Sequence, residues 1–130
     1  EAKRNAEAEK ILLELLAEFP AEYMALNNLA WMYATSTDPK FRNGKRAMEL
    51  AQRALMIAPA DYHIWSTMAE AYYIQGEYMR AERFAREALT LATRMAAPFP
   101  YEPAGKTLVA ASCQGMPRLM RRRMRNAPGP

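Results

Sequence analysis

The chain of 130 residues contains one cysteine, one histidine and no long apolar run. The single cysteine, Cys113, excludes a disulfide within the chain and a zinc site built from several cysteines. No apolar run approaches the roughly 20 residues of a membrane-spanning helix, so no transmembrane segment is predicted. With 51% hydrophobic and 25% charged residues, the composition is that of one globular domain, not of a disordered or fibrous chain.

The positive charge of the chain is concentrated near its C-terminus. The net charge is +4, but residues 1–97 hold 12 basic and 13 acidic side chains, a net charge of −1. Residues 98–130 hold six basic side chains and one acidic side chain, a net charge of +5. The basic isoelectric point therefore describes the last quarter, and it does not indicate that the preceding residues bind nucleic acid.

A repeat with two related spacings runs through residues 5–93. A shift of 39 residues aligns Ala8 with Ala47, and a shift of 34 residues aligns Ala47 with Ala81. The pairs separated by 39 residues span the segment 35–43, so a 34-residue unit with a five-residue insertion explains both shifts. The other aligned pairs are Leu12 with Ala51, Leu16 with Leu55, Pro20 with Pro59, Leu29 with Met68, Ala30 with Ala69, Tyr33 with Tyr72, Leu50 with Phe84, Ala51 with Ala85, Ala54 with Ala88 and Leu55 with Leu89.

Each unit is predicted to be a pair of helices, because the apolar residues recur at helical spacing. Asn43 and Asp61 are placed to cap two of these helices, and Gly76 can form a turn without the penalty of a Cβ atom. Within the insertion, Phe41 is expected to fold back onto the first repeat; the alternative is a contact with a partner. The expected first helices are 23–35 and 61–75, and the expected second helices are 5–18, 44–57 and 78–93.

The pattern resembles the tetratricopeptide repeat, a 34-residue helical pair with the motif W-x2-L-G-x2-Y followed by A-x3-F and a closing proline. Two positions depart from that motif. Ala85 stands where the family has an aromatic residue, and Thr93 stands in place of the proline, so the last helix can run on past 93. The residues that carry the resemblance are Trp65, Met68, Ala69, Tyr72, Gly76, Ala81 and Ala88 in one unit, and Leu26, Leu29, Ala30, Tyr33, Ala47, Ala54 and Pro59 in the unit before it.

The resemblance covers about two and a half repeats and implies an all-α fold. That fold is a right-handed α-solenoid of antiparallel helix pairs over residues 1–97, in which stacking of the pairs supplies the core. It implies a non-catalytic scaffold for protein–protein interaction, with a partner's peptide or helix bound in a concave groove lined by the first helices. The implied groove residues are Met24, Asn27, Trp31, Ala34, Thr35, His63, Ser66, Glu70, Tyr73 and Ile74.

Trp31 and Tyr73 are the expected anchors of that groove, since aromatic side chains dominate interface energetics. The alternative for Trp31 is a place in the core. Some members of the family clamp a C-terminal carboxylate with lysine and asparagine. This groove offers no lysine, and Glu70 would repel a carboxylate, so an apolar or helical ligand fits better.

Catalytic groups are scarce in the sequence, and neither a cofactor nor a metal ion is predicted. His63 has no second ligand type near it, and Cys113 lies in a stretch of small residues without a basic neighbour or a histidine. The segment 105–107, Gly-Lys-Thr, imitates the end of a phosphate-binding loop, but Pro100 stands where that loop needs its first glycine. The sequence therefore predicts that the protein is not an enzyme.

Residues 98–130 are predicted to form a linker containing prolines, a short capping helix over 106–113 and a basic tail. The tail is interpreted as solvated; the alternative function is binding of RNA or an anionic surface. Nucleic acid is disfavoured because no aromatic residues are interleaved for base stacking. The arginines of the tail are Arg118, Arg121, Arg122, Arg123 and Arg125.

The sequence also leaves open what surrounds this chain. It begins with Glu1, and helical spacing is established within its first residues, which suggests a chain cut from a longer one or matured by processing. A regulatory fragment of a larger protein is therefore another alternative for its function. A homo-oligomer is another possibility. The location in the cell is unknown; the composition fits a soluble protein of the cytoplasm or the periplasm.

Overall fold

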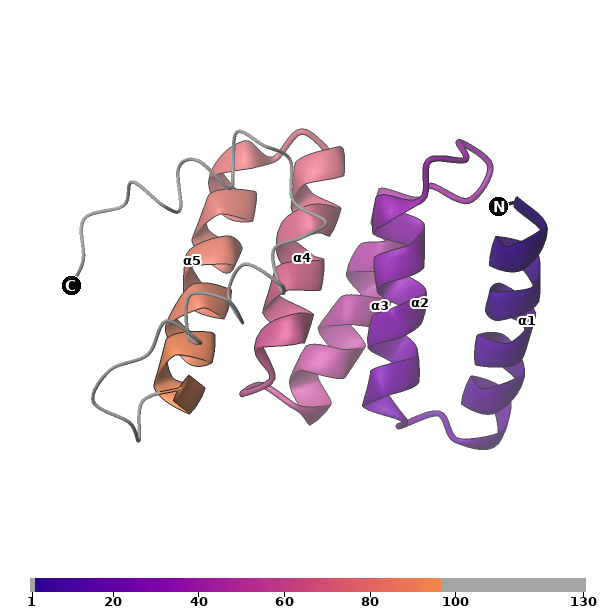
Figure 1. Cartoon of the computed structure of the whole chain (residues 1–130), viewed down its shortest axis with the longest axis horizontal. Coiled ribbons are helices and arrows are strands. Elements are labelled where there is room, and N and C mark those ends of the chain that lie inside the picture. The colour runs from indigo at the N-terminus through magenta and orange to yellow at the C-terminus, as the bar shows by residue number, and fades with distance from the viewer. Residues whose placement is uncertain (1, 97–130) are drawn as a thin grey trace.

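The computed structural model of the chain describes residues 2–96, which form five helices and no strand (Figure 1). The predicted all-helical fold of packed helix pairs is confirmed over this range. The last helix extends past Thr93, where the sequence lacks the closing proline. The predicted linker, capping helix and basic tail, together with Cys113, lie outside the described residues. The helices are α1 (Ala2–Glu18), α2 (Tyr23–Thr35), α3 (Gly44–Ile57), α4 (Tyr62–Ile74) and α5 (Tyr78–Ala96).

The helices are arranged as two successive pairs with one additional helix ahead of them. Helix α2 packs on α3 and α4 packs on α5, while contacts of α3 and α2 with α4 join the two pairs. Helix α1 packs on α2. Figure 1 shows the helices side by side, with α1 and α5 at opposite ends of the row. None of the helices within residues 2–96 combines the length and the apolar character that crossing a membrane requires.

Side-chain caps fix where three of the helices begin. The Oδ1 atom of Asn43 accepts a hydrogen bond from the backbone N–H of Arg46 at 3.1 Å, and Oδ1 of Asp61 accepts one from the backbone N–H of His63 at 3.0 Å. Both caps confirm the sequence prediction. A carboxylate oxygen of Glu22 caps α2 in the same way. Such caps satisfy N–H groups that have no partner inside the helix.

Gly76 ends α4 with a positive φ of +82°, as the sequence predicts. The N–H of Gly76 donates to the carbonyl oxygen of Tyr73 at 2.9 Å, and the N–H of Glu77 donates to that of Tyr72 at 3.0 Å. This pair of bonds is the Schellman motif, which closes a helix at a left-handed residue. It reverses the chain between α4 and α5 within three residues, so the two helices pack directly against each other.

The core consists of alanines at the helix crossings and larger side chains between them. Alanine lets two helix backbones approach closely, and the larger side chains fill the space beside each crossing. A smaller cluster of Ala69, Ala81 and Ala85 joins α4 to α5. The main cluster contains Leu26, Leu29, Ala30, Tyr33, Ala34, Ala47, Leu50, Ala51, Ala54, Ile64, Met68 and Ala71.

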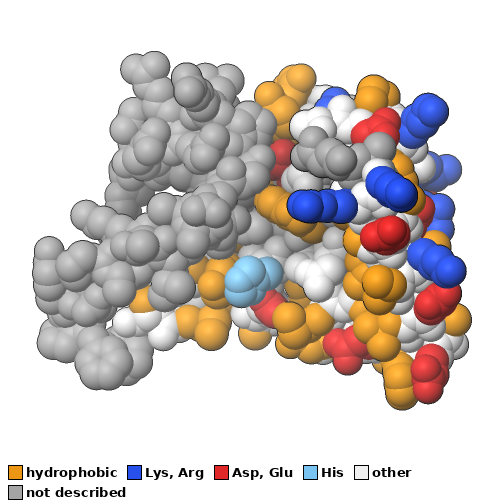
Figure 2. Space-filling model, turned by 45° about the vertical axis from the view of Figure 1, so that its right-hand side comes forward, with side chains coloured by type: hydrophobic (Ala, Val, Ile, Leu, Met, Phe, Trp, Pro, Cys, Tyr) orange, Lys and Arg blue, Asp and Glu red, His pale blue; other side chains and the backbone are white. Residues whose placement is uncertain are grey.

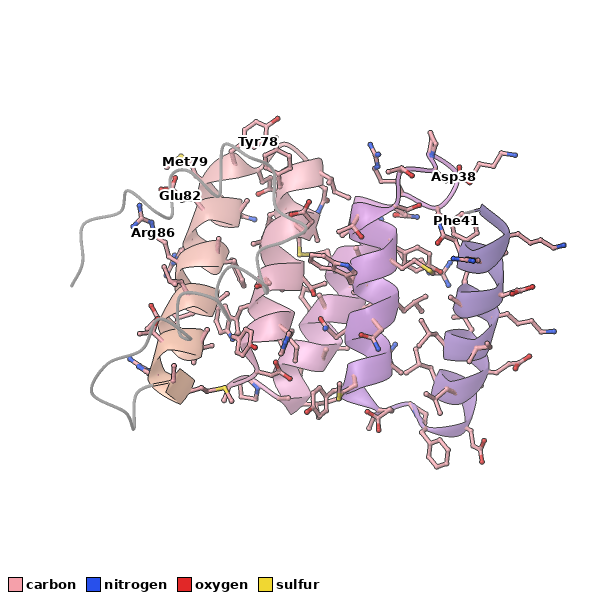
Figure 3. All side chains as sticks on the ribbon, in the orientation of Figure 1. Asp38, Phe41, Tyr78, Met79, Glu82 and Arg86 are labelled. Atoms are coloured by element: carbon pink, nitrogen blue, oxygen red, sulfur yellow. The ribbon has the colours of Figure 1, made fainter. Side chains whose placement is uncertain are left out.

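The insertion between α2 and α3 is held to α1 by one hydrogen bond and is closed on itself by another. The hydroxyl of Ser36 accepts a hydrogen bond from Nδ2 of Asn5 on α1 at 3.3 Å, and Nε of Arg42 donates to the carbonyl oxygen of Ser36 at 2.9 Å. Phe41 is half-buried and packs against the main core cluster, which confirms that it folds back onto the first repeat. Figure 3 shows Phe41 on the inner side of the loop and Asp38 above it.

Candidate binding face on helices α2 and α4

The residues predicted to line a groove lie on α2 and α4, which contact each other. The 39-residue shift gives the two helices a common register, in which Asn27 corresponds to Ser66 and Trp31 to Glu70. Side chains at equivalent positions of two neighbouring helices can therefore act on one ligand. We call this set the α2/α4 face: Met24, Asn27, Trp31, Ala34 and Thr35 on α2, and His63, Ser66, Glu70, Tyr73 and Ile74 on α4.

Two polar atoms of the α2/α4 face are buried without a hydrogen bond. They are Oδ1 of Asn27 and Oγ of Ser66, and the part of the chain that the structure describes provides no partner for either. Ser66 is only 2% exposed, whereas Asn27 is half-buried. A buried polar atom that loses its water and gains no protein partner costs about 1–3 kcal/mol. Two such atoms at equivalent positions of neighbouring repeats form a pattern that the core packing does not require.

Trp31 lies one turn from Asn27 on α2 and is half-buried, and it belongs to neither of the two core clusters. One turn further along the helix, the hydroxyl of Thr35 donates to the carbonyl oxygen of Trp31 at 2.8 Å. That hydroxyl is therefore engaged within its own helix. The neighbouring Ala34 is buried in the main cluster, so it belongs to the core.

Glu70 brings an acidic side chain onto the same face. It occupies the position on α4 that Trp31 occupies on α2, and it is only 5% exposed. A carboxylate in such an environment attracts a positive group and repels a negative one more strongly than it would in water. Glu70, the residue that argues against a carboxylate ligand, is therefore buried in the protein.

Tyr73 and Ile74 both contribute to packing between helices. Tyr73 is half-buried against the small cluster that joins α4 to α5, and its ring centroid lies 5.2 Å from that of Tyr78. Ile74 packs against the main cluster, and its side chain lies beside Gly44 at the start of α3. Of the two predicted anchors, Trp31 is thus the one that neither cluster holds.

Met24 and His63 occupy equivalent positions near the start of the two helices, and both are exposed. The imidazole Nδ1 of His63 lies 2.8 Å from Oδ1 of Asp61, and the His63 ring stacks on Tyr62 with centroids 4.0 Å apart. His63 and Asp61 lie at the N-terminal cap of α4, so the helix start explains the hydrogen bonds between them.

A contact that the sequence does not reveal ties α1 to the next helix. The hydroxyl of Tyr33 on α2 donates to Oε1 of Glu9 on α1, and the guanidinium carbon of Arg46 on α3 lies 5.1 Å from the Tyr33 ring centroid. Burial, and then the hydrogen bond to Glu9, raise the pKa of the Tyr33 phenol to about 12. The one sequence signal for this contact is that Glu9 lies three residues before Leu12 on α1. That spacing puts the two side chains on the same side of the helix.

The α2/α4 face combines exposed and half-buried apolar side chains with buried polar atoms. Within residues 2–96, no group of three or more histidine, cysteine, aspartate and glutamate side chains comes together to hold a metal ion. What the face does offer is an exposed methionine, a half-buried tryptophan and two buried oxygens without a partner. Comparison with protein-family models, curated proteins and solved structures finds no match for this chain.

Proposed function

We propose that this protein is a non-catalytic scaffold that binds a peptide or helix of a partner protein on the α2/α4 face. The observation that carries the proposal is the pair of buried oxygens, Asn27 Oδ1 and Ser66 Oγ, at equivalent positions of two neighbouring helices. Both atoms can accept a hydrogen bond, and a bound polypeptide supplies N–H donors once the side chains that cover these atoms move aside. Binding then removes a cost that the free protein carries at two places.

The partner is proposed to be apolar or helical along the contact. Trp31 and Met24 offer apolar area beside the buried oxygens, and such area favours an apolar side chain of the ligand. Glu70 adds a preference for a ligand without acidic groups at this point. Nucleic acid is an unsuitable ligand for the α2/α4 face, because the phosphates would meet Glu70 and no lysine or arginine belongs to the face.

The proposal extends to the architecture in which this face would be the concave side. A right-handed α-solenoid of the tetratricopeptide type agrees with the burial of Ala30 and Ala69, which stand where the family places a small residue. It also agrees with the buried alanines Ala47, Ala54 and Ala81 of the second helices. In such a solenoid the first helices line the inner surface, which would place α2 and α4 there.

The test begins with a peptide selected from a random library displayed on phage against the full chain. Its affinity is then measured by fluorescence anisotropy for the wild type and for Trp31→Ala. Trp31→Ala should weaken binding about tenfold or more, as loss of an aromatic anchor does. The matched control is Met79→Ala on α5, because Met79 is 88% exposed and lies off the face (Figure 3); it should bind like the wild type.

Two results would contradict the proposal. One is a selected peptide whose affinity is the same for the wild type and for Trp31→Ala, while circular dichroism shows that both proteins are equally helical. The other is a peptide that no longer binds when the chain ends at Ala97, because binding would then depend on residues 98–130. That second result would favour the alternative function of the basic tail.

A further inference from the structure

Helix α1 carries apolar side chains on two sides, and only one of the sides is covered. Leu12 and Leu16 are half-buried and pack against the core cluster to which α2 contributes. Ile11 and Phe19, by contrast, are 63% and 53% exposed, and Leu15 is 36% exposed. Figure 2 shows hydrophobic side chains lying among charged ones on the side of the molecule that α1 forms. A helix in contact with water on that side would ordinarily carry polar residues there.

The other two second helices, α3 and α5, show which kind of neighbour is missing from the uncovered side of α1. Among the described helices, α5 contacts only α4, which precedes it in the same pair. The buried positions of α5 therefore mark the side that a second helix turns toward its own first helix. Among the described helices, α1 contacts only α2, which belongs to the following pair. The side of α1 that would face its own first helix is the side without a neighbour.

The repeat register identifies this side residue by residue. The two shifts together relate α5 to α1 by 73 residues. Helix α5 buries Ala81, Ala85, Ala88 and Ala92, and its Phe84 is half-buried. Ala81, Phe84, Ala88 and Ala92 correspond to Ala8, Ile11 and Leu15 of α1 and to Phe19 just after it. Ala85 corresponds to Leu12, the residue of α1 that is already half-buried against the core cluster. The corresponding residues are Ala47, Leu50 and Ala54 of α3, which are buried, and Ala58 just after it, which is half-buried.

The same four positions are thus apolar in or just after all three second helices, and only those of α1 and Phe19 are exposed. We infer that the side formed by Ala8, Ile11, Leu15 and Phe19 is the docking site for one further helix of the α2 and α4 type, placed ahead of α1 in the same polypeptide and antiparallel to it. The sequence expected of the covering helix follows from α2 and α4, which hold the equivalent place in their own pairs. It carries a large apolar residue followed by alanine, and then an aromatic residue three positions on, as in Met68, Ala69 and Tyr72.

The register also determines how such a helix would be connected. Asn5 corresponds to Tyr78, the first residue of α5, and the three residues before Tyr78 form the turn closed by Gly76. A first helix ending in the same turn would therefore join α1 at Asn5, and residues 2–4, which are helical in the structure, would take the place of the turn. This placement leaves the α2/α4 face untouched, so the inference stands or falls independently of the proposed function.

The test grafts this helix onto the chain. A copy of residues 61–77 replaces residues 1–4, so that the copied Glu77 is joined to Asn5 as Glu77 is joined to Tyr78. The grafted chain should melt at least about 5 °C higher than the original, because each added unit of such an array buries a new interface. Amide hydrogen exchange at Ile11 and Leu15 should slow about tenfold or more. A copy in which Ala69→Glu is introduced is the matched control, and it should give neither effect.

A substitution on α1 separates docking from a general gain in helix content. Ile11→Glu should leave the melting temperature of the original chain within about 2 °C, because exposed substitutions have little effect there. In the grafted chain the same substitution should abolish the gain. Equal melting temperatures of the original and grafted chains would overturn the inference. So would a dimer of the original chain that Ile11→Glu dissociates, since a second copy would then cover the site.

Discussion

The phenol of Tyr33 donates a hydrogen bond to the carboxylate of Glu9 across the boundary between α1 and α2. Tyr33 is only 3% exposed, so the bond lies where water is largely excluded. Arg46 on α3 lies over the Tyr33 ring, so a single side chain contacts three helices. The attachment of α1 therefore depends on this polar contact as well as on Leu12 and Leu16.

Tyr33→Phe should lower the free energy of unfolding by about 1–2 kcal/mol, because the hydrogen bond is lost while the ring is kept. The loss would be measured by urea denaturation followed by circular dichroism. Tyr23→Phe is the control, since no hydrogen bond of the Tyr23 hydroxyl occurs in the described part of the chain. If the two variants have the same midpoint, the bond to Glu9 contributes nothing to stability.

The stability of the protein should also depend on pH through Tyr33. Its pKa is raised to about 12 from the ordinary value of 10.0, so between these values the folded state keeps a proton that the unfolded chain has lost. The contribution is complete below pH 10 and is lost as the pH rises from 10 to 12, by about 2–3 kcal/mol in total. Urea denaturation at pH 9 and at pH 11.5 measures it. Tyr33→Phe should show a clearly smaller decrease than the wild type; an equal decrease in both would show that other groups are responsible.

Gly76→Ala should destabilise the protein by about 1 kcal/mol, because the residue has φ of +82° and closes the turn between α4 and α5. An added Cβ would meet nothing within 4 Å, so the cost comes from the backbone conformation and not from a clash. Gly76→Asn should cost less, because asparagine tolerates the left-handed region better. Thermal unfolding of the two variants gives the comparison, and equal melting temperatures would show that the backbone conformation is not the source.

Ser66→Ala should separate stability from binding. In the free protein the Ser66 hydroxyl is buried without a partner among the described residues, so its removal should leave the free energy of unfolding unchanged or raise it slightly. Affinity for the selected peptide should nevertheless fall several-fold. Denaturation and anisotropy on the same protein samples provide both numbers. A loss of stability above about 1 kcal/mol would mean that the hydroxyl has a structural role.

The sequence predicts those features of the fold that depend on neighbouring residues. Asn43, Asp61 and Gly76 each act on backbone groups within five positions along the chain, so their roles can be inferred from residue type and spacing. The two repeat shifts also predict how the helices pair, because alanines at equivalent positions indicate equivalent helix crossings. The helix boundaries consequently agree within a few residues.

Contacts between distant residues are not accessible in the same way. The spacing on α4 predicts Ile74 as a groove residue, and the sequence gives no sign that it also packs against the main cluster and beside Gly44, where α3 begins next to the end of α4. The bond between Tyr33 and Glu9 likewise depends on how α1 is rotated against α2. The lack of a partner for Asn27 and Ser66 emerges only when every neighbour has been placed.

The most direct measurement of the central proposal is a titration of the 15N-labelled full chain with the selected peptide, followed by backbone and side-chain amide chemical shifts. The largest shifts should occur at Asn27, Trp31 and Ser66, including the side-chain amide of Asn27 and the indole N–H of Trp31. Trp65, whose indole donates to the carbonyl oxygen of Pro59 at 2.8 Å, serves as the internal control and should shift little. Largest shifts on the outer side of α1 or within residues 98–130, with none on the α2/α4 face, would contradict the proposal.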